Sequence, residues 1–119
     1  MLVIRSEQMR VLAEAGLRSE IESTMRRLFP RHCAELGDAG CTATVCAAME
    51  RGRSFGFHSA ELRAYVALEF CFGTDFADNP EYTWAQELLR DRSIPSEVRM
   101  QKLRSAAIFY LAGLAEARQ

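Results

Sequence analysis

Apolar residues recur at steps of three or four along most of this chain, which is the spacing of one helix face. The longest such stripe lies within residues 6–28 and consists of Met9, Ala13, Leu17, Ile21, Met25 and Leu28. Arginine and glutamate alternate at four-residue steps beside it, as is typical of an exposed helix face. We predict a long amphipathic helix that Ser6 caps and that ends before Pro30, with a bend or break near Gly16.

Three further helical segments are expected in the next part of the chain. Pro30 opens a short helix that Gly37 ends, and another helix, which Asp38 caps, runs out at Gly52 to Gly56. A fourth helix spans residues 59–72 with Ser59 as its cap. Apolar side chains surround this fourth helix on nearly all sides, which is the pattern of a buried helix. It is therefore the predicted centre of the fold.

Large aromatic residues gather where this central helix ends and the next one begins. Gly73 stops the helix, Thr74 to Asn79 form a polar loop, and Pro80 opens a fifth helix that runs to Asp91, with Asn79 as its cap. Buried Phe and Trp side chains cover roughly 150–250 Å² each. Much of the core is therefore expected from four aromatic residues, Phe70, Phe72, Phe76 and Trp84.

The remaining pattern completes an all-α prediction. A last helix begins at Ser93 or Ser96 and carries a stripe that includes Met100, Leu103, Leu111 and Leu114. No segment shows the alternation of a half-buried strand over more than a few residues. The 119 residues therefore predict one compact domain over residues 1–119, a bundle of five or six helices around a central helix at about Ser59 to Phe72.

Composition narrows the classes of function. Hydrophobic residues make up 49% and charged residues 26%, which are ordinary values for a globular protein. The apolar runs are too short to span a bilayer, and the first residues lack the features of a signal peptide. We therefore expect a cytoplasmic protein without membrane insertion. A net charge of −1 gives no general attraction to nucleic acid, and residues 38–49 hold no basic residue, so no nucleic-acid partner is expected.

Charge is unevenly distributed along the chain. Residues 60–91 carry two basic and seven acidic residues, whereas residues 92–119 carry five basic and two acidic residues. Residues 1–31 are also basic on balance, with six basic and four acidic residues. Solvated helix faces explain this distribution most simply, and terminal helices lying near the acidic middle are the alternative.

Reactive side chains form no recognisable catalytic or metal-binding pattern. The four cysteines, Cys33, Cys41, Cys46 and Cys71, contain no CxxC pair and are interpreted as free buried thiols. His32 and Cys33 are neighbours, but adjacent helical residues point about 100° apart, which disfavours a nucleophilic pair. The acidic loop lacks the register of an EF-hand, and no glycine-rich phosphate loop is present. We expect no enzyme activity, no metal and no cofactor.

An α-helical domain without reactive groups usually acts through its surface. The candidate partner-binding residues are three aromatic residues and three acidic residues near the central loop, namely Phe55, Phe57, Tyr82, Asp75, Asp78 and Glu81. The aromatic residues serve the core in the alternative interpretation, and the acidic residues serve as caps and solvated groups.

Several segments resemble a known group of proteins. These are IRSEQM near the start, LFPRHCAELG from Leu28 to Gly37, the FGF segment after Gly52, FCFGTDF, and NPEYTWAQELLRD from Asn79 to Asp91. With them the chain resembles a family of small, uncharacterised helical proteins encoded in bacterial type VI secretion effector clusters, beside spike, adaptor and toxin genes. It departs from the family pattern at Ala77, where a second acidic residue is expected, and at Thr83, where a proline often precedes the tryptophan.

The resemblance implies an accessory role and no catalytic residue. In the first hypothesis the protein binds an adaptor, an effector or a spike component that is encoded nearby. In the second it is an immunity protein that neutralises a neighbouring toxin with its acidic surface. A small enzyme that uses His32 and Cys33 is the third hypothesis. The sequence does not decide whether the protein forms a homodimer through its terminal helices.

Overall fold

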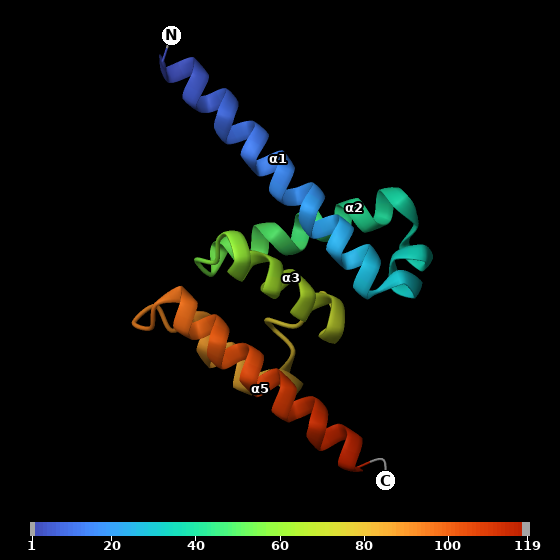
Figure 1. The fold of residues 1–119 in the computed structure, drawn as a ribbon. Helices are drawn as coiled ribbons and strands as arrows, with labels where there is room; N and C mark the ends of the chain where they lie inside the picture. Colours follow the sequence, from blue (N-terminus) through green and yellow to red (C-terminus); the bar gives the residue numbers. More distant parts are fainter. Residues whose placement is uncertain (1, 118–119) are drawn as a thin grey trace. The chain divides into compact units, whose positions relative to one another are not determined.

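The computed structural model describes the backbone of residues 2–117 and the side chains of residues 8–116. Within this range the elements are helices and loops, and the predicted all-α fold is confirmed (Figure 1). The elements are α1 (Leu2–Leu28), α2 (Pro30–Ser54), α3 (Ser59–Phe72), the 3₁₀-helix η1 (Pro80–Tyr82), α4 (Thr83–Arg90) and α5 (Ser96–Ala117). The chain divides into unit 1, residues 1–47, and unit 2, residues 48–119, which are described separately.

Helix α1 begins earlier than expected and uses only part of its apolar stripe. It starts at Leu2, so Ser6 lies inside the helix and the predicted cap is wrong. It also continues through Gly16 without a break. Ile21 and Met25 are fully buried, whereas Met9 is 68% exposed. The stripe therefore supplies core side chains only in the C-terminal half of the helix.

The predicted stop at Gly37 is a kink within α2. Gly37 has φ 75° and ψ 170°, a conformation that glycine adopts without a steric penalty. Cys33 and Cys41 are both buried on either side of the kink, and the Cys41 thiol donates to Cys33 Sγ at 3.3 Å. The helix then runs to Ser54, within the predicted end at Gly52 to Gly56.

Polar contacts join α1 to the part of α2 that lies in unit 1. Arg26 Nη1 lies 3.1 Å from Asp38 Oδ1, and the Thr42 hydroxyl donates to Glu22 Oε1. The Arg26–Asp38 pair is exposed on both sides, so it contributes little to stability. Burial of apolar side chains such as Ile21 and Met25 stabilises this unit more strongly than the exposed ion pair does.

In unit 2, α3 has the predicted bounds but a different start. Ser59 has φ 53° and is the first helical residue, while His58 occupies the cap position without a side-chain hydrogen bond. The predicted Ser59 cap is therefore wrong. Gly73 ends the helix as predicted, with φ 108° and its N–H donating to Glu69 O at 2.8 Å.

Helix α3 is the buried helix that the pattern predicts. Its buried residues are Leu62, Tyr65, Val66, Leu68, Glu69 and Phe70. Both α3 and α4 pack against α5 (Figure 1). The last turns of α2 approach α3 closely at Gly52, where an added Cβ would lie 2.6 Å from Leu62 Cδ1 and 2.9 Å from Tyr65 Cδ1. Glycine is therefore required for this contact.

The segment after the central loop is two helices rather than one. The predicted Asn79 cap is confirmed, because its Oδ1 accepts the Glu81 N–H at 2.9 Å. The first turn is the 3₁₀-helix η1, and α4 follows from Thr83 to Arg90. Phe76 is fully buried next to this segment, but Trp84 is only half-buried.

A buried arginine connects three segments of unit 2. Arg99 is 3% exposed, and its guanidinium lies over the Phe57 ring at 5.0 Å from the centroid. It donates to three backbone carbonyls, those of Ile94 at 3.1 Å, Leu89 at 2.9 Å and Phe55 at 2.7 Å. These bonds satisfy a buried charge and fix two loops and the end of α4.

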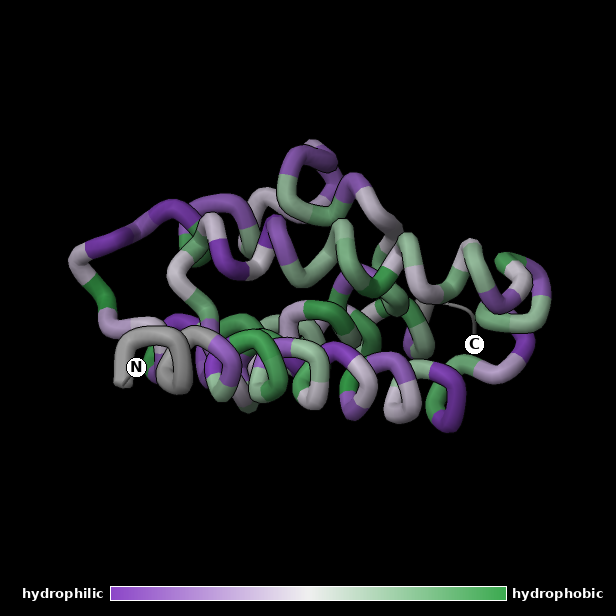
Figure 2. Tube along the Cα trace, turned by 90° about the horizontal axis from the view of Figure 1, so that it is seen from above, coloured by the Kyte–Doolittle hydropathy of each residue, from purple (hydrophilic) through white to green (hydrophobic). Residues whose placement is uncertain are grey.

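Hydrophobic and hydrophilic residues are interspersed along the helical segments (Figure 2). Within the described residues, no helix combines the length and the apolar character that crossing a bilayer requires.

Candidate protein-binding surfaces

The structure places the FGF segment largely in the core. Phe57 is fully buried, and its ring stacks on Tyr65 with centroids 5.9 Å apart. Phe55 is half-buried, with its centroid 5.8 Å from that of Tyr65. These contacts argue against a partner contact at Phe57, because a fully buried ring cannot meet another protein without unfolding of its surroundings. Sequence periodicity carries no sign of this burial, since the segment lies in a loop.

Tyr82 belongs to a cluster of aromatic rings. Its centroid lies 5.0 Å from Phe72, 5.6 Å from Phe76 and 5.6 Å from Tyr110. Trp84 joins the same cluster at 5.7 Å from Phe72. Such edge-on and tilted pairs stabilise a fold beyond the area that they bury. Tyr82 is half-buried, and these ring contacts make it mainly part of the core.

The three acidic candidates lie on the surface beside one another in the chain. Asp75 accepts from Asn79 Nδ2 at 3.2 Å, and Asp78 forms an exposed ion pair with Arg90 at 3.0 Å. Glu81 is exposed at the start of η1, where its backbone N–H is bound by Asn79. These contacts match the capping and solvation interpretation, and the carboxylates remain accessible to a partner.

The structure does not favour a thiol nucleophile at Cys33. Cys33 is buried next to Cys41, whereas His32 is exposed. Burial raises the pKa of Cys41 to about 11, and the hydrogen bond with Cys33 acts in the same direction. A nucleophilic cysteine needs the opposite shift, toward the thiolate. Among the described residues, no group of three His, Cys, Asp or Glu side chains is arranged to hold a metal ion.

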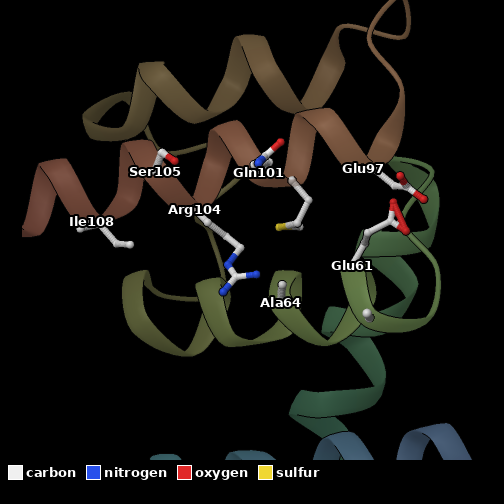
Figure 3. Close-up of a pocket in the computed structure, with 9 residues that line it drawn as sticks. Glu61, Ala64, Glu97, Gln101, Arg104, Ser105 and Ile108 are labelled. Atoms are coloured by element: carbon white, nitrogen blue, oxygen red, sulfur yellow. The ribbon is translucent and has the colours of Figure 1, made fainter.

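A groove of about 360 Å³ lies between α3 and α5 in unit 2 (Figure 3). It is lined by Ala60, Glu61, Ala64, Glu97, Met100, Gln101, Arg104, Ser105 and Ile108. Glu61 and Glu97 approach each other at one end, and Arg104 extends from α5 toward α3. Ile108 lies at the opposite end and is 69% exposed. The groove therefore offers one acidic end and one apolar end.

Glu61 gives the acidic end of the groove an unsatisfied acceptor. Its Oε1 is buried and has no hydrogen-bond partner among the described residues. A buried carboxylate oxygen without a partner costs free energy. A cationic side chain that enters the groove from another protein would supply the missing donor.

The first half of α1 is the most exposed apolar helix surface in unit 1. Every residue from 8 to 16 is exposed. Met9 is 68% exposed, Val11 60% and Leu12 70%. Met9 and Leu12 are three residues apart and share one side of the helix. The stripe that predicts a core face is therefore open to solvent in this half.

A second exposed apolar surface lies on α5. Ile108 is 69% exposed and Phe109 83%, and Leu111 and Leu114 are exposed by 45% and 41%. The sequence pattern assigns Leu111 and Leu114 to the core stripe of this helix. Both are exposed, so this assignment is wrong. The absence of charge from Ser105 to Ala115 is the signal in the sequence for an apolar surface here.

Comparisons of this chain with protein-family models, with curated proteins and with solved structures found no match.

Proposed function

We propose that this protein is a non-enzymatic interaction protein that binds another protein through an exposed helix face. The observation that carries the proposal is the first half of α1, where Met9 and Leu12 share one side of the helix and are 68% and 70% exposed. Large apolar side chains gathered on one exposed helix are typical of a partner-binding site.

The length of this exposed segment supports the proposal. Isolated helices shorter than about 12–15 residues are marginal in water, and helices in proteins depend on packing of their apolar face. Residues 8–16 are exposed throughout, so they lack that packing. A partner that covers Met9 and Leu12 would supply it, in the manner of a helix laid into an apolar groove.

The identity of the partner is proposed from the resemblance alone. Proteins that resemble this chain are encoded beside spike, adaptor and toxin genes of type VI secretion effector clusters. We therefore propose an adaptor, an effector or a spike component as the partner. The role is that of an accessory protein that holds its neighbour through helix-face contacts.

The test is co-expression with the products of the flanking genes, followed by size-exclusion chromatography with light scattering. We expect one of these products to elute with this chain as a stoichiometric complex. Elution of every soluble neighbour apart from this chain would overturn the proposal.

Two variants locate the interface within such a complex. Leu12→Glu places a charge on the side of α1 that carries Met9, and it should abolish co-elution. Val11→Glu makes the same kind of change about 100° away around the helix and is the matched control. If the Leu12→Glu variant still forms the complex, the partner binds a surface other than this side of α1. Circular dichroism of both variants checks that the helices remain formed.

An immunity protein is the second candidate, and the acidic surface of unit 2 favours it. Asp75, Asp78 and Glu81 are exposed, and Glu61 and Glu97 line the groove between α3 and α5. Inhibitors of basic catalytic clefts commonly present acidic surfaces. Survival of cells that express a neighbouring toxin, with and without this chain, separates the two roles. Protection that Glu61→Gln and Glu97→Gln together remove would support the immunity role, and unprotected cells would exclude it.

A further inference from the structure

Helix α5 carries three residues at heptad spacing on one exposed strip. Lys102, Phe109 and Glu116 are seven residues apart, so they lie nearly above one another on the helix. All three are exposed, and Phe109 at 83% is the most exposed of the large hydrophobic residues that the structure describes. The strip therefore has a positive end, an aromatic centre and a negative end.

Small residues surround Phe109 on this side of α5. Ser105 precedes it by four residues, and Ala112 and Gly113 follow by three and four, which are the neighbouring positions on a helix face. An added Cβ at Gly113 would meet nothing within 4 Å. A second helix can thus approach the backbone closely, with the Phe109 ring as the protruding group.

We propose that this strip is a self-association interface, in which α5 of two copies crosses antiparallel about a two-fold axis at Phe109. This symmetry places the residue n positions before Phe109 opposite the residue n positions after it in the second copy. Lys102 then faces Glu116 of the second copy, and the reverse pair forms on the other side. The two Phe109 rings meet at the axis.

Charge selects the antiparallel arrangement. In a parallel pair Lys102 would face Lys102 of the second copy and Glu116 would face Glu116, which is repulsive at both ends. The antiparallel pair replaces both repulsions with two opposite-charge contacts. Exposed ion pairs are weak, so they set orientation while burial of the two Phe109 rings provides most of the affinity. A single crossing helix buries little area, and the dimer should dissociate on dilution.

This inference is independent of the proposed function, because it concerns α5 in unit 2 whereas the proposed partner covers α1 in unit 1. Failure of either proposal leaves the other standing. A dimer that forms without any flanking gene product supports the inference alone.

The first test is a zero-length carbodiimide cross-link between an amine and a carboxylate. Lys102 is the only lysine in the chain. Within one chain Lys102 and Glu116 are fourteen residues apart, or about 21 Å along the helix, so a direct link within one α5 is excluded. Protein with ordinary nitrogen is mixed with protein labelled with heavy nitrogen, and cross-linked peptides are identified by mass spectrometry.

We expect a Lys102–Glu116 peptide in which the two halves carry different isotopes. Links from Lys102 only to carboxylates of its own chain, or to carboxylates other than Glu116 of a second copy, would overturn the proposed geometry. The N-terminal amine gives peptides of different mass, and its products are distinguished directly.

The second test uses charge reversal with sedimentation equilibrium. Lys102→Glu and Glu116→Lys should each raise the dissociation constant of the dimer by about tenfold, because each change affects both symmetry-related pairs. The double variant Lys102→Glu/Glu116→Lys exchanges the two charges and should restore the original value. Phe109→Ser should give a monomer, with its helix content checked by circular dichroism.

Leu12→Ser on α1 is the matched control, since it removes a residue that is 70% exposed on a different helix. It should leave the dimer unchanged. A wild-type monomer at every concentration reached, a dimer unaffected by both charge reversals, or a dimer lost in Leu12→Ser would each overturn the inference.

Discussion

At the scale of single residues, Glu69 is the most informative side chain. It is 3% exposed on a helix that the sequence predicts to be buried, and no sequence pattern indicates a partner for it. Arg51 supplies that partner with two hydrogen bonds, from Nε at 2.8 Å and from Nη2 at 2.6 Å. The fork of the guanidinium matches both carboxylate oxygens. The hydrogen bond to Glu69 also raises the pKa of Arg51.

Arg51→Ala should lower the free energy of unfolding by about 2 kcal/mol, because it leaves the Glu69 carboxylate buried without its partner. The loss is smaller than for a fully buried pair, since the Arg51 side chain is 38% exposed and solvent screens it. Urea unfolding at pH 7 measures the change.

The double variant Arg51→Ala/Glu69→Gln is the control for this prediction. It removes the unpaired charge and should be more stable than Arg51→Ala alone. A double variant that is less stable than the single variant would show that the ion pair is not the source of the effect.

Because the Cys41 thiol has a raised pKa, we predict that the protein loses stability at high pH. Its pKa is about 11 in the folded protein against an ordinary value of 9.0, because burial disfavours the thiolate. The unfolded chain therefore releases the proton first as the pH rises, and between pH 9 and pH 11 unfolding becomes progressively more favourable. Well below pH 9 the thiol is protonated in both states and contributes no pH dependence.

Urea midpoints measured across this range test the prediction. The midpoint should fall as the pH rises, and Cys41→Ala should show a shallower fall than the wild type. Burial also raises the pKa of Tyr65, so Cys41→Ala is compared with Tyr65→Phe to separate the two groups. A wild-type and a Cys41→Ala profile that run parallel would contradict the assignment.

At the scale of the elements, replacing two glycines by alanine should change the stability in opposite directions. Gly52 lies where α2 meets α3, and an added Cβ would lie 2.6 Å from Leu62 Cδ1. Gly16 lies inside α1, where an added Cβ would meet nothing within 4 Å. Gly52→Ala should therefore destabilise the protein by about 1–3 kcal/mol through overpacking. Gly16→Ala should stabilise its helix by roughly 0.5–1 kcal/mol.

Thermal unfolding followed by circular dichroism measures both variants under the same conditions. Gly16→Ala serves as the control for Gly52→Ala, since the chemical change is the same and only the surroundings differ. Equal stabilities of the two variants would mean that α2 and α3 do not approach closely at Gly52.

Element bounds are predictable where a local signal and the tertiary structure agree. The range Ser59–Phe72 is correct because Gly73 ends the apolar run with the positive φ that glycine adopts readily. The cap at Ser59 is wrong because the chain enters α3 through His58, which has no side-chain cap. The end of α2 at Ser54 lies within the predicted range of Gly52 to Gly56, but the close approach of Gly52 to α3 is not predictable from the local pattern. Such contacts depend on a distant segment and leave no local pattern.

The candidate site is less predictable than the fold for the same reason. Aromatic residues in loops are expected to be available for a partner, yet Phe57 is held under Arg99 from a helix much further along the chain. Conversely, Met9 belongs to a regular core stripe and is exposed. Periodicity identifies which side chains share a face, but it does not show whether another element covers that face.

At the scale of the whole chain, one buried cation connects three segments of unit 2. Arg99 connects the loop after α2, the end of α4 and the loop before α5 through the carbonyls of Phe55, Leu89 and Ile94. Burial lowers the pKa of Arg99, but a guanidinium keeps its charge in proteins. Three carbonyl acceptors at fixed positions require the planar, multiple-donor fork of arginine.

Arg99→Met should therefore lower the free energy of unfolding by about 3 kcal/mol, because it leaves three carbonyls without their donor while keeping similar side-chain volume. Arg99→Lys should recover only part of this loss, since one ammonium group cannot reach three carbonyls in the arginine geometry.

Arg92→Met is the matched control. Arg92 is exposed and donates to the Ser54 carbonyl in the same loop, so its loss should cost less than about 1 kcal/mol. Hydrogen exchange of the amides of Gly56 and Phe57, both of which bond to α2, gives a local readout. Their protection should fall in Arg99→Met more than in Arg92→Met. If amide protection falls equally in the two variants, Arg92 and Arg99 order this loop together, and the prediction that Arg99 dominates is wrong.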